Sequence, residues 1–394
     1  MDQKKPKILI FSLSYYPHFV GGAEVAIKEI TDRLGEFDFD MVTLRFERSL
    51  PKVEKIGNVT VHRIGWTSSN KVTPTHVLFW LNLNKYFFPI TGFFKAMMLS
   101  RRYHYAAMWG MMATYSSFAA LFLKLLSPKT KFLLTLQEGD PIPHIKKRAL
   151  PVWPLFKLMF KKADCLQTIS KYLADFGREM GAIGPIIVVP NGVDVKRFSK
   201  GHTLDEIKDI QVQIGKKEGD VFLIHTGRLV LKNALDDVIS ALPLLPSNIK
   251  FLLVGRGPLE ENLKTQARIL GVGERVIFHD FVDHEKLALF LKASDIFIRT
   301  PISEGFGNSF VEAMAAGIPC VATPVGGILD FIRDGETGVF AQVHNPQSVA
   351  DAVTRLSRDT DLYSRIKRQA FEMVKEKYDW DIIGDEMRKI FKSL

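Results

Sequence analysis

The chain has 394 residues, 46% apolar and 24% charged, a composition typical of globular proteins large enough for two or three domains. Its only cysteines, Cys165 and Cys320, lie far apart in apolar runs, which argues against a disulfide framework and favours a reducing compartment. The N-terminus enters a strand-like apolar run at residue 7, too early for a signal peptide. We therefore expect a cytoplasmic protein.

The net charge of +10 is concentrated in one part of the chain. Residues 71–162 contain 14 Lys and Arg against two acidic residues, Glu138 and Asp140, and they hold 17 of the 43 aromatic residues. Basic residues interleaved with aromatic ones favour contact with an anionic, partly apolar partner such as a membrane surface. Nucleic acid is the other polyanion to consider, but no nucleic-acid-binding motif accompanies the charge, so we expect no such partner.

Residues 77–99 are apolar but interrupted by Asn82, Asn84, Lys85, Pro89 and Lys95, whereas a spanning helix needs about 20 predominantly apolar residues. We therefore expect a helix that lies in the membrane interface. The aromatic clusters expected to face outward are Phe79-Trp80, Tyr86-Phe87-Phe88, Phe93-Phe94 and Trp153, and basic residues at 146–148, 157, 161 and 162 repeat the pattern. The alternative is that most of these aromatic residues belong to the core.

The first half of the chain alternates strand-like apolar runs with segments of helical periodicity. Strands are expected at 7–12, 40–44, 59–64, 105–109, 131–136, 164–169 and 186–190. Helices are expected at 23–34, 112–126, 153–163 and 171–180. This alternation predicts a parallel sheet covered by helices on both faces.

The second half begins after Pro190-Asn-Gly-Val-Asp194 and a polar stretch that extends to Gly219. Strands are expected at 221–226, 250–254, 275–278, 295–299 and 319–322. Helices are expected at 235–245, 258–270, 284–293, 308–316, 346–357, 361–377 and 380–392. The sequence therefore predicts two doubly wound halves.

Three loops that follow strands of the second half are marked by glycine. Thr226-Gly-Arg-Leu-Val-Leu-Lys232 places Arg228 and Lys232 beside a strand end, where two cations can clamp a diphosphate. Val254-Gly-Arg-Gly-Pro258 allows a tight strand-to-helix turn but is not the dinucleotide-binding fingerprint. Open α/β sheets bring such loops to one edge, where ligands bind.

The third loop, Glu304-Gly-Phe-Gly-Asn-Ser-Phe-Val-Glu312, places two carboxylates eight positions apart with glycines between them. It lies between a strand-like run and the body of a helix. Carboxylates accept hydrogen bonds from hydroxyl groups, and backbone amides at a helix N-terminus hold anions. The loop therefore suits a ligand with both hydroxyls and phosphates, such as a nucleotide sugar.

No metal site is expected. The chain has no zinc-type spacing of cysteine and histidine, no P-loop and no G-x-S-x-G motif. Two D-x-D triplets, at Asp38/Asp40 and Asp379/Asp381, lie outside the three candidate loops.

Taken together, these motifs resemble the retaining glycosyltransferases of the GT4 type, which have the GT-B fold. The resemblance rests on Thr226-Gly-Arg-Leu with Lys232, Val254-Gly-Arg-Gly-Pro258, Ser294-Asp295, the run from Ser303 to Thr323, Gly326-Gly327, Gly21-Gly22-Ala-Glu24 and Asn191-Gly192-Val-Asp194. It covers nearly the whole chain. It is specific in 220–340 and weak in 45–130, where acceptor binding is expected to diversify.

The resemblance implies an α/β protein with two doubly wound, Rossmann-like domains and a cleft between them. Residues 1–195 would bind the acceptor, 196–378 would bind the nucleotide sugar, and the helix in 379–394 would pack back on the first domain. Arg228 and Lys232 would neutralise the donor diphosphate, while Glu304 would contact sugar hydroxyls and Glu312 the ribose hydroxyls. Further donor contacts are implied at Gly21, Gly22, Gly227, Gly255, Gly257, Gly305, Phe306, Gly307, Asn308, Ser309 and Phe310.

The chain departs from the family pattern in two places. Many relatives have Lys-Gly where this chain has Asn233-Ala234, so Lys232 is either the working lysine displaced by one place or its neighbour. Many also have a histidine in the loop after the strand at 131–136, where this chain has Gln137 and Glu138. We take Glu138 as the catalytic candidate there, with Gln137 and His144 as alternatives, although Glu138 and Asp140 could simply cap the following turn.

The predicted function is metal-independent, retaining transfer of a sugar from a nucleoside-diphosphate donor to an acceptor hydroxyl, in glycolipid, cell-wall or polysaccharide synthesis. The nucleotide sugar is a substrate, and no cofactor is expected. The acceptor would be lipid-linked, a saccharide or another molecule, reached at the inner face of the membrane. The alternatives are another GT-B activity, such as a sugar phosphorylase or synthase, and a catalytically silent module that binds sugar or lipid.

Overall fold

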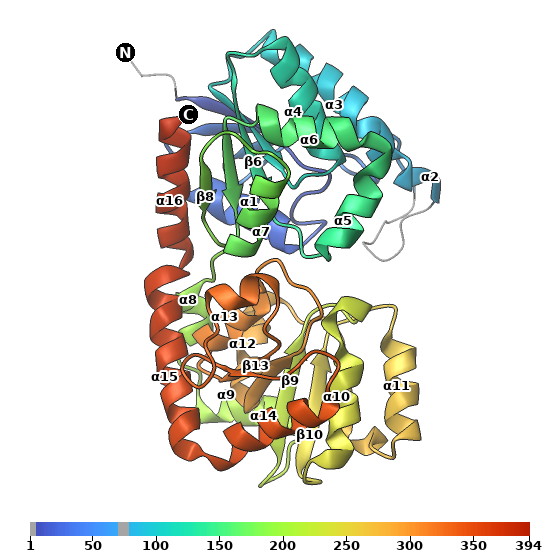
Figure 1. Cartoon of the computed structure of the whole chain (residues 1–394), viewed down its shortest axis with the longest axis vertical. Coiled ribbons are helices and arrows are strands. Elements are labelled where there is room, and N and C mark those ends of the chain that lie inside the picture. The colour runs from blue at the N-terminus through green and yellow to red at the C-terminus, as the bar shows by residue number, and fades with distance from the viewer. Residues whose placement is uncertain (1–4, 70–78) are drawn as a thin grey trace. The chain divides into compact units, whose positions relative to one another are not determined.

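The computed structural model describes residues 5–69 and 79–394, and Figure 1 shows the course of the chain. The chain divides into two compact units. Unit 1 comprises the chain up to Glu138, Ile142–Asn191 and Trp380–Leu394; unit 2 comprises Gly139–Pro141 and Gly192–Asp379. For three residues of the predicted basic and aromatic surface, the structure describes no side chain. Lys71 lies outside the described residues, and so do the side chains of Phe79 and Trp80.

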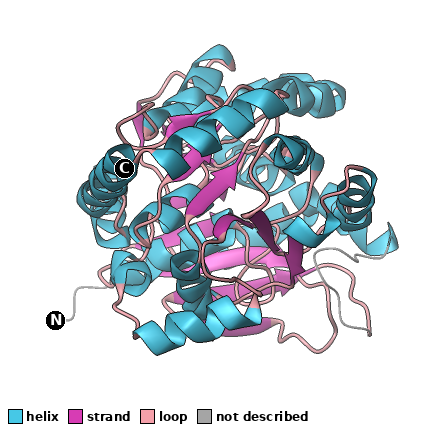
Figure 2. Cartoon of the chain, turned by 90° about the horizontal axis from the view of Figure 1, so that it is seen from below, coloured by secondary structure: helices cyan, strands magenta, loops and turns pink. Residues whose placement is uncertain are grey.

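Unit 1 is built on a mainly parallel sheet with the strand order β3-β4-β2-β1-β5-β6-β7-β8 in the described part of the chain. Its strands are β1 (Lys7–Phe11), β2 (Asp38–Leu44), β3 (Val53–Ile56), β4 (Val59–Ile64), β5 (Ala107–Met111), β6 (Lys131–Leu136), β7 (Cys165–Thr168) and β8 (Ile186–Val188). Among the described strands of this sheet, only β3 and β4 pair in an antiparallel way. Figure 2 shows the strands of the chain surrounded by helices. Strands buried in this way are expected to be apolar, and β1, β5 and β6 are almost wholly so.

The helices of unit 1 are α1 (Gly22–Arg33), α2 (Phe79–Asn82), α3 (Asn84–Ser100), α4 (Tyr115–Leu126), α5 (Ile142–Ala149), α6 (Trp153–Lys162), α7 (Lys171–Glu179) and α16 (Trp380–Ser393). In the described part of the chain, none of them combines the length and the apolar character needed to cross a bilayer. Helix α4 begins at Tyr115, later than the expected residue 112, because Met112 has a left-handed backbone with φ of 65°.

Helix α16 belongs to unit 1 although it ends the chain. Phe391 lies 5.3 Å from Trp109 and 6.0 Å from Phe39, ring centre to ring centre, and thereby joins the sheet's core. Two ion pairs add to this packing: Arg33–Asp381 at 2.7 Å and Arg388–Glu36 at 2.6 Å.

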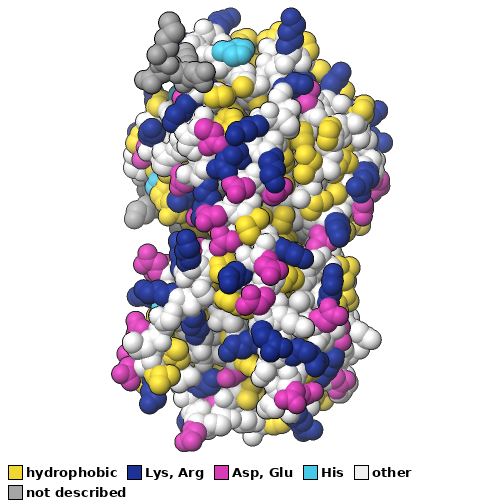
Figure 3. Space-filling view, turned by 90° about the vertical axis from the view of Figure 1, so that its left-hand side faces the viewer, with side chains coloured by type: hydrophobic (Ala, Val, Ile, Leu, Met, Phe, Trp, Pro, Cys, Tyr) yellow, Lys and Arg dark blue, Asp and Glu magenta, His cyan; other side chains and the backbone are white. Residues whose placement is uncertain are grey.

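On the face drawn in Figure 3, basic and acidic side chains are interspersed, as in a solvated surface.

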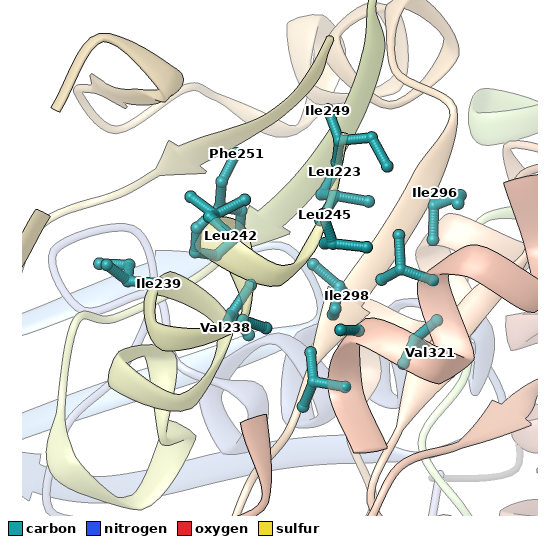
Figure 4. Packing of buried hydrophobic residues seen from close by; sticks show 14 of the residues in the cluster. Leu223, Val238, Ile239, Leu242, Leu245, Ile249, Phe251, Ile296, Ile298 and Val321 are labelled. Carbon is teal, nitrogen blue, oxygen red and sulfur yellow. The ribbon is translucent and has the colours of Figure 1, made fainter. Parts of the chain in front are cut away.

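Unit 2 contains a parallel sheet with the order β11-β10-β9-β12-β13-β14. Its strands are β9 (Val221–Thr226), β10 (Ile249–Val254), β11 (Val276–His279), β12 (Ile296–Arg299), β13 (Cys320–Ala322) and β14 (Val339–Phe340). Its helices are α8 (Val195–Ser199), α9 (Leu204–Gln213), α10 (Leu235–Ala241), α11 (Glu260–Ile269), α12 (His284–Ala293), α13 (Asn308–Ala315), α14 (Pro346–Arg358) and α15 (Thr360–Lys377). Figure 4 shows helix α10 packing through Val238, Ile239 and adjoining Leu242 against strand residues such as Leu223 and Phe251.

The predicted α/β class and the two doubly wound halves are confirmed. The elements that sequence analysis missed have little apolar signal. Helix α9 buries none of its residues and begins with a capping box made by Thr203 and Glu206. Strands β3 and β14 are short, and neither has enough residues for a periodic pattern.

Removing the Phe391 side chain should destabilise unit 1. The variant Phe391→Ala leaves a cavity among Phe37, Phe39 and Trp109, and such losses cost about 3–5 kcal/mol. Thermal and urea unfolding would measure the cost, with exposed Lys392→Ala as the control on the same helix. A loss below about 1 kcal/mol would mean that α16 is not part of the core of unit 1.

Candidate functional site

The three glycine-marked loops of unit 2 all follow strands at the carboxyl edge of one sheet. Strand β9 pairs in parallel with both β10 and β12, so the loops that follow these three strands are neighbours. The predicted convergence of the loops within unit 2 is therefore present in the fold.

The loop after β9 carries two of the predicted cations, Arg228 and Lys232. Gly227 opens the loop with φ of 137°, and Ala234 closes it with a left-handed backbone, φ of 44°, just before α10. The buried Asn233 holds the loop's shape, since its Nδ2 donates to the Arg228 carbonyl at 2.6 Å. Lys232 is thereby turned toward the neighbouring loop after β12.

The loop after β10 needs its glycines because it lies against the backbone of the β9 loop. A Cβ atom at Gly255 would lie 2.1 Å from the Gly227 carbonyl oxygen, and one at Gly257 would lie 2.2 Å from that of Leu229. The two loops are also joined by a hydrogen bond from the Leu229 amide to the Arg256 carbonyl, 3.1 Å. These glycines therefore shape the site by close backbone approach.

The loop after β12 ends in the N-terminus of α13. Gly307 is the residue before the helix and has φ of 103°, which favours glycine. Phe306 and Phe310 are fully buried; Phe306 packs on Phe331 and Phe310 on Phe297. Their side chains belong to the core, so any ligand contact at these two positions has to come from the backbone.

Glu304 is the centre of a buried charged cluster. Its Oε2 forms an ion pair with Arg299 Nη2 and lies 3.8 Å from Lys232 Nζ, while its Oε1 accepts from the Gly305 amide at 3.1 Å. Lys232 Nζ also donates to the carbonyl of Gly139, which belongs to the same unit, at 3.1 Å. The carboxylate is thus held by two cations and one amide.

The pKa values of Glu304 and Lys232 are both lowered in this cluster. Burial opposes ionisation of Glu304, but Arg299, Lys232 and the Gly305 amide outweigh it and hold the pKa of the carboxyl below its ordinary value. Burial lowers the pKa of Lys232, with further lowering by Arg299 and Arg228, although Glu304 opposes it. Glu304 is therefore an anion at neutral pH.

Glu312 occupies a different environment on α13. Burial raises the pKa of its carboxyl, and His284, whose Nδ1 lies 3.8 Å from Glu312 Oε1, acts in the opposite direction. The two carboxylates of the motif therefore differ: Glu304 is fixed between cations, whereas Glu312 has a single titratable neighbour within ion-pair distance among the described residues.

The predicted site residues of unit 1 lie in two loops. Gly21 and Gly22 follow β1 at the N-terminus of α1, and the Gly21 amide donates to Glu24 at 3.1 Å. Glu138 follows β6, is buried, and accepts a hydrogen bond from the Ala113 amide at 2.6 Å. Gln137 and His144 are the alternatives to Glu138 as the catalytic candidate of this loop. Gln137 donates a hydrogen bond to Asn191 at 3.0 Å, and His144 is exposed on α5.

Arg299 was missed by sequence analysis. It ends the apolar strand β12, where an isolated arginine gives no signal of its partner. Its position five residues before Glu304, in a run that is otherwise buried, is the one feature that could have drawn attention to it. Asp40, from one D-x-D triplet, is accounted for by contacts with Lys7 and Tyr105. The described residues contain no group of three potential metal ligands.

Two Rossmann-like units with this loop arrangement define a GT-B glycosyltransferase fold. Residues 206–373 match the model for glycosyl transferases group 1, and residues 20–197 match that for glycosyltransferase family 4. The chain therefore belongs to the GT4-type glycosyltransferases, the family that its motifs resemble.

Several curated proteins are similar to this chain. One uncharacterized glycosyltransferase of Methanocaldococcus jannaschii is 27% identical over 99% of both chains. A second one from the same organism is 30% identical over 52% of this chain and 53% of its own length. A phosphatidyl-myo-inositol mannosyltransferase of Mycobacterium leprae is 30% identical over 55% of this chain and 56% of its own length. Except for the first of these, the chain spans only about half the length of the relatives named here.

The fold is also shared with solved structures. Sucrose-phosphate synthase from Thermosynechococcus elongatus has a TM-score of 0.83 at 19% identity, with 99% of each chain covered. HepE from Anabaena, solved in complex with UDP and glucose, has a TM-score of 0.79 at 19% identity, covering 99% of this chain and all of its own.

Gly257→Ala should disrupt the site through the backbone. Its Cβ would collide with the Leu229 peptide, so both loops must shift, and we expect a loss of more than about 1 kcal/mol of stability together with weaker nucleotide binding. Thermal unfolding with and without UDP would measure both effects. Gly273→Ala is the control, since its Cβ meets no atom closer than 3.8 Å. Equal behaviour of the two variants would contradict the packing argument.

Proposed function

We propose that this protein transfers a sugar from a nucleoside diphosphate to an acceptor hydroxyl, with retention of anomeric configuration and without a metal ion. The observation that carries the proposal is the buried Glu304 held by Lys232 and Arg299 beside the N-terminus of α13. A fixed anion beside fixed cations and helix amides suits a ligand that joins a sugar to a diphosphate.

In this proposal, Arg228 and Lys232 bind the donor diphosphate. Their loop is hydrogen-bonded to the loop that leads into α13, through the Ile302 amide and the Lys232 carbonyl, and the dipole at a helix N-terminus also favours an anion. HepE, which shares the fold, has been solved with UDP and with UDP-glucose, and this supports a nucleotide sugar as donor. Fixed cations can neutralise a departing diphosphate, so the reaction needs no metal ion for this purpose.

The two carboxylates would bind hydroxyl groups. Glu304 is kept ionised by its neighbours and can accept hydrogen bonds from the sugar, while Glu312, farther along α13, would accept from the ribose. The bond between C1 of the sugar and the diphosphate breaks as the acceptor oxygen bonds to C1. The nucleoside diphosphate leaves with the electron pair, and the acceptor proton is released to it or to solvent. Glu138 would act on the acceptor side.

Glu304→Gln and Lys232→Ala should each lower turnover by roughly 10²–10³-fold while the fold is kept, because each removes a charge aimed at the reacting groups. Arg228→Ala should lose more of its activity through donor affinity. Transfer from UDP-, GDP- and ADP-sugars, measured at saturating donor, would test this. Glu274→Gln and Lys208→Ala are matched controls on exposed positions of unit 2. Near wild-type turnover in Glu304→Gln would refute the site assignment.

The proposal includes a membrane surface as the place of reaction and a lipid-linked or otherwise anionic acceptor. Exposed apolar side chains on α3 recur along one face of the helix, at Tyr86, Phe87, Ile90, Phe94 and Met98. Each of them is about half exposed. Together with the +12 charge of residues 71–162, this stripe supports adsorption to an anionic bilayer.

The expected outward orientation is wrong for Phe88, which is fully buried in the packing of unit 1. Phe93 and Trp153 are partly exposed, and Trp153 stacks on the buried Phe156. The mannosyltransferase of Mycobacterium leprae, whose name specifies a phosphatidylinositol acceptor, supports a lipid acceptor in this family.

Sedimentation with vesicles tests the membrane contact. We expect binding that rises with the fraction of anionic lipid, falls with salt, and weakens in Phe87→Ser/Phe94→Ser and in Lys147→Gln/Arg148→Gln. Leu204→Ser/Val212→Ser is the control, since these side chains of α9 in unit 2 are 79% and 78% exposed. If the protein ignores anionic vesicles at low salt, the acceptor is to be sought among soluble saccharides.

A further inference from the structure

Arg299 is a buried arginine on an interior strand. It ends β12, which pairs with β9 and β13, and it is only 9% exposed. A guanidinium is rarely buried unless its N–H groups have partners. Arg299 donates to Asn233 Oδ1 from Nε at 3.2 Å and from Nη2 at 2.7 Å, to Ser309 Oγ from Nη1 at 3.2 Å, and it pairs with Glu304.

Asn233 links this arginine to the loop that carries Arg228. Its Oδ1 accepts the two hydrogen bonds from Arg299, and its Nδ2 donates to the Arg228 carbonyl. Because the side chain is 2% exposed, water has almost no access to it. Both ends of the amide are therefore used, one to fix the buried cation and the other to fix the loop.

The neutral side chain at position 233 is what permits the buried arginine, because it accepts hydrogen bonds from the guanidinium and carries no charge of its own. A lysine ammonium here would lie beside the Arg299 guanidinium, and two like charges in a buried site are strongly unfavourable. Asparagine at 233 and arginine at 299 are thus electrostatically complementary, while Lys232 approaches Glu304 separately at 3.8 Å.

We propose that Arg299 is a positioning residue: held in place by Asn233, it supplies a buried positive charge that fixes Glu304 and complements that of Lys232. This inference rests on the proposed function, because Glu304 is the group that it positions. Arg299 acts through Glu304 and need not touch the donor.

The first test is the pH dependence of transfer. In Arg299→Met, Glu304 keeps only Lys232 as a cation, so its pKa rises and the acidic limb of kcat/KM moves to higher pH. Turnover at neutral pH should fall roughly 10²-fold, and Arg299→Lys, which keeps the charge but not the fork of donors, should move the limb less. A purely structural arginine would lower activity without moving the limb.

The second test is a charge exchange between positions 233 and 299. Asn233→Lys alone should lose activity and melting temperature, because its ammonium faces Arg299. Asn233→Lys/Arg299→Met removes that repulsion and returns a cation to the neighbourhood of Glu304, so it should recover part of both losses. If the losses of the two single variants simply add, positions 233 and 299 are not coupled and the proposal is wrong.

The third test does not depend on activity. A carboxyl whose pKa is lowered by folding adds stability above its unfolded pKa, and this contribution is lost as pH falls through the folded pKa. The melting temperature of Arg299→Met should therefore lie farther below the wild type at pH 7 than at pH 4, with a gap of roughly 5–10 °C at pH 7.

Arg275→Met is the matched control, since Arg275 donates only to backbone carbonyls of unit 2 among the contacts described, at Ile249, Leu245 and Pro246. The melting temperature of Arg275→Met should lie below that of the wild type by the same amount at both pH values. If the gap in melting temperature for Arg299→Met is equally insensitive to pH, the proposal fails. If that gap depends on pH but the wild-type protein transfers sugar from no donor, the proposed function fails while the coupling of Arg299 to Glu304 is supported.

Discussion

The candidate site of unit 2 depends on one buried carboxylate between two cations. Glu304 is 8% exposed, and only the pairing with Arg299 and Lys232 makes an ionised side chain tolerable there. Removing one member of such a group leaves an uncompensated charge, which typically costs about 3–5 kcal/mol. The positions of the β9 and β12 loops are therefore coupled, because each loop contributes a charge that the other needs.

The backbone carries the rest of the site. The Glu304 carbonyl accepts from the Gly327 amide at 3.0 Å, and the Ile302 amide donates to the Lys232 carbonyl at 2.9 Å, so the loop after β12 is tied to both neighbouring loops. Close approaches at Gly255 and Gly257 lock the β10 loop against the β9 loop in the same way. A rigid frame of this kind can hold charges in place before a ligand arrives, which is the condition for electrostatic catalysis.

Much of this arrangement could be predicted from sequence, because parallel strands bring their carboxyl ends to one edge and glycines mark the turns. The two doubly wound halves were predicted in that way, and so was the proximity of Lys232 to Glu304, whereas the role of Arg228 stays a prediction. Arg299 could not be found, since one arginine in an apolar strand does not reveal which carboxylate it faces. Phe88 and Phe94 also look equivalent in sequence; only the helical geometry of α3 buries the first and exposes the second. The short strand β3 and the polar helix α9 lacked any periodic apolar signal.

The central claim is that a nucleoside diphosphate binds at the edge formed by the loops after β9 and β12. Hydrogen–deuterium exchange with saturating UDP tests it most directly, because it reports backbone amides along the whole chain without requiring an acceptor. The account predicts slower exchange in peptides that cover residues 227–234 and 304–310, and loss of that protection in Lys232→Ala. Protection by bound UDP that is confined to other segments of the chain would contradict the account.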